Sequence, residues 1–196
     1  MLLINQTLFL LRDNAIICTD LTTQKTKHFF FKQRVFSLMK LKSTSEDEQG
    51  FKINSYKVLV VCANGTLGSL IPKNINLMTD WERQTDTTST PMFMNKDHVV
   101  HTFQNQNTCK SVYLVCQTVG TEQKIYQIAY NLSVSSLKIQ MGQQDLAFII
   151  NTTSRQRELI GLVDQRSLTI YKNDNGQISR FYSVNFSILE IRGVTQ

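Results

Sequence analysis

Basic and aromatic residues are mixed between residues 25 and 42, the part of the sequence best suited to bind a charged partner. The cations there are Lys25, Lys27, Lys32, Arg34, Lys40 and Lys42. Three consecutive phenylalanines, Phe29 to Phe31, lie among them. Cations neutralise phosphates and aromatic rings stack on bases, so this composition suits single-stranded nucleic acid. The competing interpretation is structural. In it, the rings fill the space between sheets and the lysines protect an outer strand. We favour the structural role, because three consecutive phenylalanines cannot all face one groove.

A second candidate site is centred on Trp81, the only tryptophan of the chain. It lies in the polar sequence Thr79-Asp80-Trp81-Glu82-Arg83, ahead of a run rich in threonine, serine and aspartate. We predict an inserted loop over residues 76–96, with a short helix near Leu77 to Gln84 as the one helical candidate. A tryptophan in a polar loop can anchor a protein partner, although packing onto its own domain is at least as common. The predicted partner-binding residues are Trp81, Arg83, Arg155 and Arg157.

Residues for catalysis are poorly supported. His98 and His101 are three positions apart in an apolar run, an odd offset that puts them on opposite faces of a strand. The four cysteines lack the spacing of a metal or redox motif and are predicted to be free thiols. No serine elbow or phosphate-binding glycine loop is present. The sequence therefore predicts no enzyme, no catalytic residue, no metal or other cofactor, and no small-molecule substrate.

Length and composition favour one globular domain over residues 1–196. The chain has a net charge of +6 and 18% charged residues, which suits either an acidic partner or simple solubility. Its first residues lack the pattern of an export signal, and no apolar run is long enough to cross a bilayer. We expect an intracellular protein of the nucleus or cytoplasm, without membrane contact.

Short apolar runs separated by polar turns recur through the sequence. The clearest set has four short runs within about 40 residues. It begins with Leu146 to Ile150 and Leu159 to Val163 and continues to Val184. Equivalent sets begin near Val35, Val99 and Phe186. Four strands in each such interval are typical of one propeller blade.

This repeat resembles a divergent WD-repeat β-propeller. The resemblance implies an all-β fold of about four blades, each of four antiparallel strands. Because Thr7 to Leu11 is the first long run, it is expected to be a second strand, and Phe186 to Ile191 would complete its blade, so that the two termini share one blade. The Trp-Asp and Gly-His pairs of standard repeats are absent, so their buried hydrogen-bond network cannot be carried over.

A small oligonucleotide-binding barrel in the first half of the chain is the competing fold. It leaves the runs from Asp145 to Gln196 unexplained, because such a barrel uses five strands. The sequence thus predicts a non-enzymatic protein–protein interaction scaffold, a subunit of a larger intracellular complex. The alternative is a nucleic-acid-binding module that uses the basic and aromatic surface.

Overall fold

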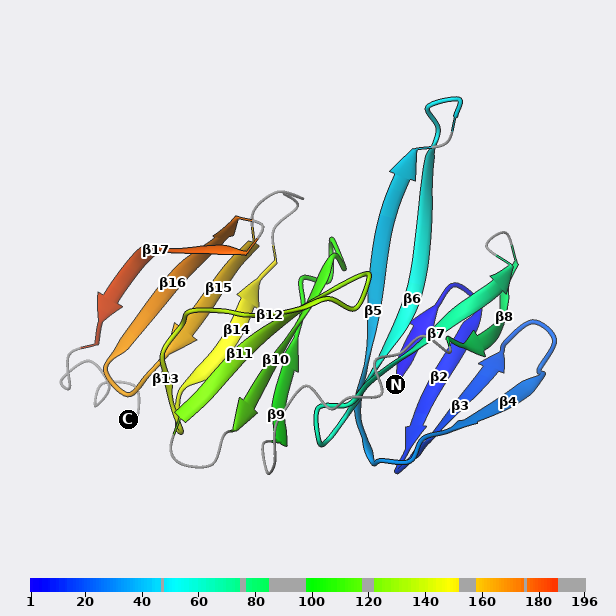
Figure 1. Cartoon of the computed structure of the whole chain (residues 1–196), viewed down its shortest axis with the longest axis horizontal. Helices are drawn as coiled ribbons and strands as arrows, with labels where there is room; N and C mark the ends of the chain where they lie inside the picture. The colour runs from blue at the N-terminus through cyan, green and yellow to red at the C-terminus, as the bar shows by residue number, and fades with distance from the viewer. Residues whose placement is uncertain are drawn as a thin grey trace, which may run out of the picture.

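The chain forms four antiparallel β-sheets arranged in sequence order (Figure 1). The computed structural model describes residues 1–46, 48–74, 77–84, 98–117, 122–151, 158–174 and 176–186. These residues contain strands and turns, and none of them is helical. The predicted all-β fold with about four blades is confirmed.

Each sheet is a meander of neighbouring strands, with a short extra strand in the third. Sheet A contains β1 (Leu2–Ile4), β2 (Thr7–Arg12), β3 (Ala15–Asp20) and β4 (Thr26–Phe30). Sheet B contains β5 (Val35–Glu46), β6 (Lys52–Cys62), β7 (Leu67–Asn74) and β8 (Leu77–Arg83). Sheet C contains β9 (His98–Phe103), β10 (Ser111–Gln117), β11 (Glu122–Ala129) and β12 (Val134–Ser136), with β13 (Met141–Gly142) also paired to β11. Sheet D contains β14 (Leu146–Ile150), β15 (Glu158–Val163), β16 (Ser167–Asp174) and β17 (Gln177–Asn185).

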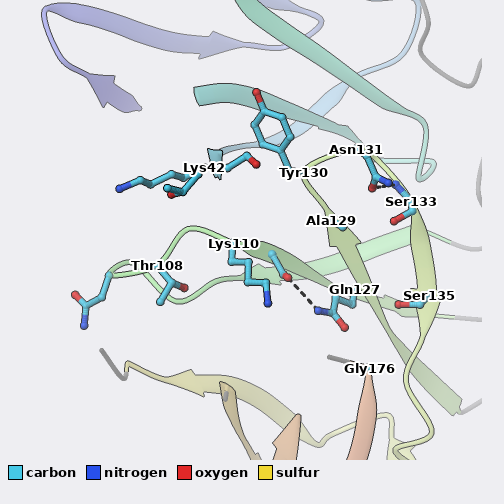
Figure 2. A pocket seen from close by; sticks show the side chains of 14 residues that line it. Lys42, Thr108, Lys110, Gln127, Ala129, Tyr130, Asn131, Ser133, Ser135 and Gly176 are labelled. Atoms are coloured by element: carbon cyan, nitrogen blue, oxygen red, sulfur yellow. Dashed lines mark hydrogen bonds between the residues drawn. The ribbon is translucent and has the colours of Figure 1, made fainter. Parts of the chain in front are cut away.

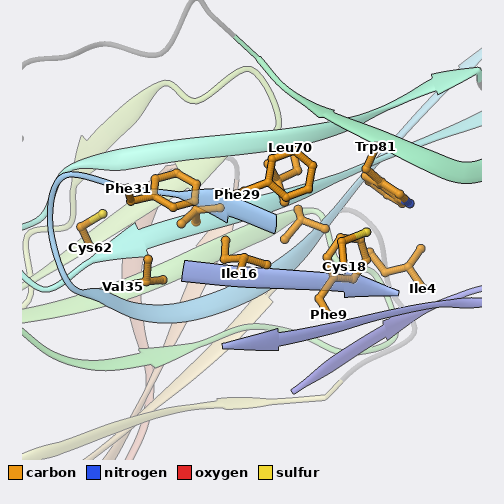
Figure 3. Close-up of a cluster of buried hydrophobic side chains, with 12 residues drawn as sticks. Ile4, Phe9, Ile16, Cys18, Phe29, Phe31, Val35, Cys62, Leu70 and Trp81 are labelled. Carbon is orange, nitrogen blue, oxygen red and sulfur yellow. The ribbon is translucent and has the colours of Figure 1, made fainter. Parts of the chain in front are cut away.

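Apolar side chains join each sheet to the next through three separate cores. Between sheets A and B, Phe9 and Ile16 pack with Val58, Leu70 and Trp81 (Figure 3). The second core joins β5 and β6 of sheet B to β9, β10 and β11 of sheet C. The third joins sheets C and D. The four sheets therefore stack side by side, as blades do in a propeller.

The second strand of each inner sheet supplies side chains to two cores. Along β6, Val58 and Val60 enter the core with sheet A, whereas Leu59 and Val61 enter the core with sheet C. β10 repeats the pattern between sheets B and D. Because successive side chains of a strand point to opposite faces, a strand covered on both faces must be apolar throughout. This explains why Val58 to Cys62 of β6 and Val112 to Cys116 of β10 are continuous apolar runs.

The first sheet differs from the prediction of a blade shared by the two termini. Leu2–Ile4 forms β1 and pairs with β2, so sheet A takes all four strands from the N-terminal part of the chain. The sequence analysis overlooked this strand because it has only three residues before the turn at Asn5. Of the expected C-terminal partner strand, only Phe186 is among the described residues.

The predicted loop over residues 76–96 begins as a strand. Leu77–Arg83 is β8, the outer strand of sheet B, where Trp81 is opposite Pro72. The short helix predicted near Leu77 is therefore wrong, and residues 85–96 lie outside the described residues. The barrel predicted as an alternative is also wrong, because the first half forms two separate four-stranded sheets.

Trp81 is part of the core and not an exposed anchor. Its side chain is 0% exposed, and its ring meets the ring of Phe9 edge to face with a centroid distance of 4.9 Å. The indole Nε1 donates a hydrogen bond of 3.3 Å to Thr7 Oγ1. The polar neighbours of Trp81 misled the sequence analysis, since alternate residues of an outer strand face solvent.

Replacing Trp81 with alanine should destabilise the fold by about 3–5 kcal/mol, because a large buried ring is lost and a cavity remains. Urea unfolding followed by circular dichroism measures this loss. Trp81→Phe should cost less, and Phe51→Ala, at a side chain that is 66% exposed, should cost almost nothing. An alanine variant at position 81 as stable as the wild type would contradict the packing described here.

Candidate functional site

A cavity of about 780 Å³ lies where sheets B, C and D meet (Figure 2). It is bordered by the end of β5, the segment between β9 and β10, the end of β11 with the turn after it, and the turn between β16 and β17. Its lining residues are Lys42, Ser43, Thr44, Asn107, Thr108, Lys110, Ser111, Gln127, Ala129, Tyr130, Asn131, Ser133, Ser135 and Gly176. Most carry hydroxyl, amide or ammonium groups, and no carboxylate is among them.

Two lysines are among the residues that line this cavity, and the charge of one of them, Lys110, also acts on Glu158. Lys110 lies between the second strand of sheet C and the preceding segment, and Figure 2 shows its side chain extending beside Gln127. Lys42 is at the far side, where its Nζ is 5.8 Å from the centroid of the Tyr56 ring. The backbone N–H of Lys42 donates to the carbonyl oxygen of Cys109 at 2.8 Å. This bond ties β5 to the segment that carries Lys110.

A cation on the aromatic ring positions Tyr130, which forms part of the cavity wall. Lys57 Nζ lies 4.5 Å from the centroid of the Tyr130 ring and donates to Gln84 Oε1 at 3.2 Å. Lys57 is buried, and its burial lowers the pKa of the ammonium group. Burial likewise raises the pKa of Tyr130. The charge of Lys57 therefore interacts with the ring of Tyr130 and holds it in the cavity wall.

A chain of hydrogen bonds runs from the cavity into the core between sheets C and D. Gln127 Nε2 donates to Ser111 Oγ at 2.9 Å, and Gln127 Oε1 accepts from Asn173 Nδ2 at 3.2 Å. Asn173 Nδ2 also donates to the hydroxyl of Tyr113 at 2.8 Å. Tyr113 in turn donates to Glu158 Oε2. The hydrogen bonds with Ser111 and Asn173 fix the orientation of the Gln127 amide.

The inner end of this network is a buried tyrosine–glutamate pair. Burial raises the pKa of Glu158, against the opposing effects of the Tyr113 hydrogen bond and the positive charge of Lys110. Burial, together with the nearby carboxylate, raises the pKa of Tyr113. The second carboxyl oxygen, Glu158 Oε1, is buried without a hydrogen-bond partner among the described residues. The Tyr113 hydroxyl and the Glu158 carboxyl therefore both hold their protons more tightly than the same groups do in water.

The arrangement is suited to binding. Tyr113 and Glu158 are not among the lining residues, but Glu158 interacts directly with one of them, since the positive charge of Lys110 lowers its pKa against the effect of burial. The cavity itself offers ammonium, amide and hydroxyl donors. The described residues contain no cluster of three or more histidine, cysteine, aspartate or glutamate side chains that could hold a metal ion.

The predicted partner-binding residues do not come together at this cavity. Trp81 is buried, and Arg83 Nη1 donates to the carbonyl oxygen of Phe30 at 3.4 Å while its guanidinium covers the ring of Phe31. These contacts join sheet B to sheet A. Arg155 and Arg157 lie outside the described residues.

Some basic side chains between residues 25 and 42 make contacts within the fold, and others are exposed to solvent. Lys27 Nζ donates to the carbonyl oxygen of Trp81 at 2.8 Å and forms an ion pair with Asp80 at 3.4 Å. Lys40 covers the ring of Tyr56 with its Nζ 4.5 Å from the centroid. Lys25, Lys32 and Arg34 are exposed. Of the six predicted contacts with nucleic acid, Lys42 alone lines the cavity.

The sequence analysis did not identify Lys110, Gln127 or the Tyr113–Glu158 pair. These residues are up to 60 positions from their partners, as in the Tyr113–Asn173 bond, and no local motif connects them. One signal was present: Glu158 begins an apolar run, where a charged residue is uncommon unless it has a partner.

The four cysteines are free, as predicted, and all are buried. Burial raises the pKa of Cys18 to about 11 and also raises the pKa of Cys62 and Cys109. These thiols are therefore not activated nucleophiles.

Comparison with solved structures supports the fold class. A luciferin-regenerating enzyme, a β-propeller, superposes with a TM-score of 0.51 and 9% identity over 96% of this chain. The N-terminal domain of Nup159, also a β-propeller, has a TM-score of 0.37 and 13% identity over 90% of this chain. The match covers 59% of the first protein and 60% of the second, so this chain spans less than two thirds of either. The fold is that of a β-propeller-like protein.

Comparison of sequences adds no family. No protein-family model matches this chain, and no curated protein matches it either. The resemblance to WD repeats therefore rests only on the repeated pattern of strands in the sequence.

The prediction of a non-enzymatic interaction scaffold is corrected by the structural comparison. That prediction excluded an enzyme because the sequence lacks catalytic motifs, yet the luciferin-regenerating enzyme, a protein of similar fold, is an enzyme. The fold therefore does not exclude an enzyme. The barrel of the nucleic-acid-binding alternative is absent from the described sheets, whereas binding by the basic and aromatic surface stays a prediction. In the described residues no helix is long and apolar enough to span a membrane. The location in the nucleus or cytoplasm and the protein partner stay predictions.

The stability of the fold should depend on pH through Glu158. Its pKa is raised above the ordinary value of 4.5, so the folded state binds this proton more tightly than the unfolded state. The resulting stabilisation is complete below the ordinary value and is lost as pH rises through the raised pKa. E158Q cannot titrate, so its free energy of unfolding should rise relative to the wild type as pH rises from about 4 to about 8.

Urea unfolding at a series of pH values measures this difference. E82Q, at an exposed position of β8, is the matched control and should follow the wild type at every pH. A constant difference between E158Q and the wild type would contradict a raised pKa at position 158.

Proposed function

We propose that the chain is a ligand-binding β-propeller module whose cavity takes a small, polar, negatively charged molecule. The observation that carries this proposal is the cavity lined by Lys42 and Lys110 with hydroxyl and amide side chains, whose described lining residues include no carboxylate. Its volume of about 780 Å³ is in the range of cavities that hold small organic ligands.

The charge of the ligand follows from the donors available. An ammonium group attracts phosphate or carboxylate as a point charge, and serine, threonine and asparagine side chains hydrogen-bond to hydroxyl groups. A phosphorylated or carboxylated molecule of about the size of a sugar would use both kinds of group. Lys110 is the main anchor in this proposal, because its side chain extends along the wall beside Gln127 (Figure 2).

The orientation of the ligand would depend on Gln127. Its amide is held by Ser111 at one end and by Asn173 at the other, at 2.9 and 3.2 Å. Such a pre-oriented amide binds a ligand without losing much side-chain entropy.

Titration calorimetry with glucose 6-phosphate, glucuronate and neutral glucose tests the proposal. The two anions should bind and glucose should bind much more weakly. K110A should weaken binding of the anions by roughly 10- to 100-fold, since a hydrogen bond to a charged group contributes about 1.5–3 kcal/mol.

K52A is the matched control, because Lys52 is an exposed lysine on β6 that does not line the cavity. Its affinity for the anions should equal that of the wild type. Equal binding by K110A and K52A, or no binding of either anion to the wild type, would overturn the proposed function.

A further inference from the structure

Sheet A has an apolar face that no other described part of the chain covers. We call it end face A and define it by Leu3, Leu8, Leu10, Ala15, Ile17 and Phe30. Leu2 and Ile4 of β1 point into the core with sheet B, so Leu3 points away, and its side chain is 56% exposed. In β4, Phe29 is buried in the same core, whereas Phe30 is 65% exposed.

Strand pairing places these side chains together. Leu3 is opposite Leu8, Leu10 is opposite Ile17, and Ala15 is opposite Phe30. Residues that are directly opposite in a sheet point to the same side. End face A therefore extends across all four strands, and Arg12, Thr19, Thr26 and His28 lie on the same side of the sheet.

Sheet D has a similar face at the other end of the molecule. We call it end face D and define it by Leu146, Phe148, Ile150, Ile170, Tyr182 and Val184. Ala147 and Ile149 of β14 pack into the core with sheet C, so their neighbours along the strand point away from it. Leu146 is 56% exposed, and Tyr182, which is opposite Ile170, is 54% exposed.

The two faces do not meet each other. The three core clusters of the described residues join sheets A to B, B to C and C to D, and none of them contains residues of both A and D. Figure 1 shows β1–β4 and β14–β17 at opposite ends of the row of sheets. An apolar patch of a few hundred Å² on a soluble protein often marks an interaction site.

We propose that a second copy of the chain covers both faces. End face D of one copy packs on end face A of the other, and the reverse contact forms at the same time through a two-fold rotation. The resulting ring has eight blades, which is within the size range of β-propellers. Both surfaces that this contact requires are present on one chain, and the closed pair leaves neither face exposed.

The match to a single-chain propeller supports an incomplete ring. Four sheets of this chain correspond to 59% of the luciferin-regenerating enzyme, so further sheets are needed to complete a ring of that kind. A second copy supplies four. The contacts at the two new junctions would repeat the chemistry of the three internal ones, which are apolar cores between neighbouring sheets.

The area of the faces is sufficient for a stable dimer. A face of four strands and five residues is about 19 Å wide and about 17 Å long, or about 320 Å². Two junctions cover four such faces, about 1,300 Å² in total, which is within the range of about 1,200–2,000 Å² for stable protein interfaces. This estimate counts flat area and is a minimum, because side chains interdigitate.

Sedimentation velocity of the purified chain tests the proposal first. The expected species has twice the chain mass of 22.5 kDa, and this mass should not increase with concentration because the ring is closed. A monomer overturns the proposal, including a monomer in which residues 187–196 cover end face D. Assemblies that grow with concentration overturn it as well, since they indicate open head-to-tail chains.

Charged substitutions on each face then test which surfaces meet. L3E on end face A and L146E on end face D should each give monomers, because every junction uses one face of each kind. An equal mixture of the two variants should recover dimers in part, since one of its two junctions contains neither substitution. If only one of the two variants dissociates, like faces meet and the proposal is overturned.

Three controls accompany these measurements. Phe51→Glu, at an exposed aromatic side chain between β5 and β6, should remain dimeric. Circular dichroism should show that both variants remain folded, which their exposed positions favour. F30E and Y182E substitute other exposed residues of the same two faces, and replace L3E and L146E if either of those fails to fold.

Discussion

The packing of one apolar sheet face on the next is the interaction on which the whole structure depends. Each of the three cores lies between two sheets, and strands such as β6 and β10 contribute to two cores at once. Where such a strand is covered on both faces, as at Val58 to Val61 of β6, it cannot contain a run of polar residues, since every side chain there enters one core or the other. Sheets at the ends of the row have only one core, and their second face stays apolar although nothing among the described residues covers it.

The cavity exists because this packing is interrupted at the strand ends. Lys42 is near the end of the long strand β5, Ser111 begins β10, and Gly176 is in the turn before β17. Polar groups at these positions do not disturb the cores. Where the polar network does enter a core, at Tyr113 and Glu158, the two groups are hydrogen-bonded to each other, which reduces the cost of burying them.

Much of the repeat could be predicted from local pattern. The sets expected to begin near Val35, Val99 and Leu146 do begin with strands at Val35, His98 and Leu146. Asp164 accepts hydrogen bonds from the backbone of its own turn, as its type and place indicate. β1 was overlooked because three residues contain too little alternation to be recognised, and β8 because its exposed side chains are polar.

Sequence alone determined the all-β class, the positions of most strands and the free state of the cysteines, because these follow from alternation, turn residues and spacing within a few positions. Tertiary structure decided which faces meet. It placed Trp81 against Phe9, joined Tyr113 to Glu158 and Asn173, and assembled a cavity from segments between residues 42 and 176. Contacts between residues so far apart depend on how whole sheets stack, and the local pattern of a strand contains no information about its partner in the next sheet.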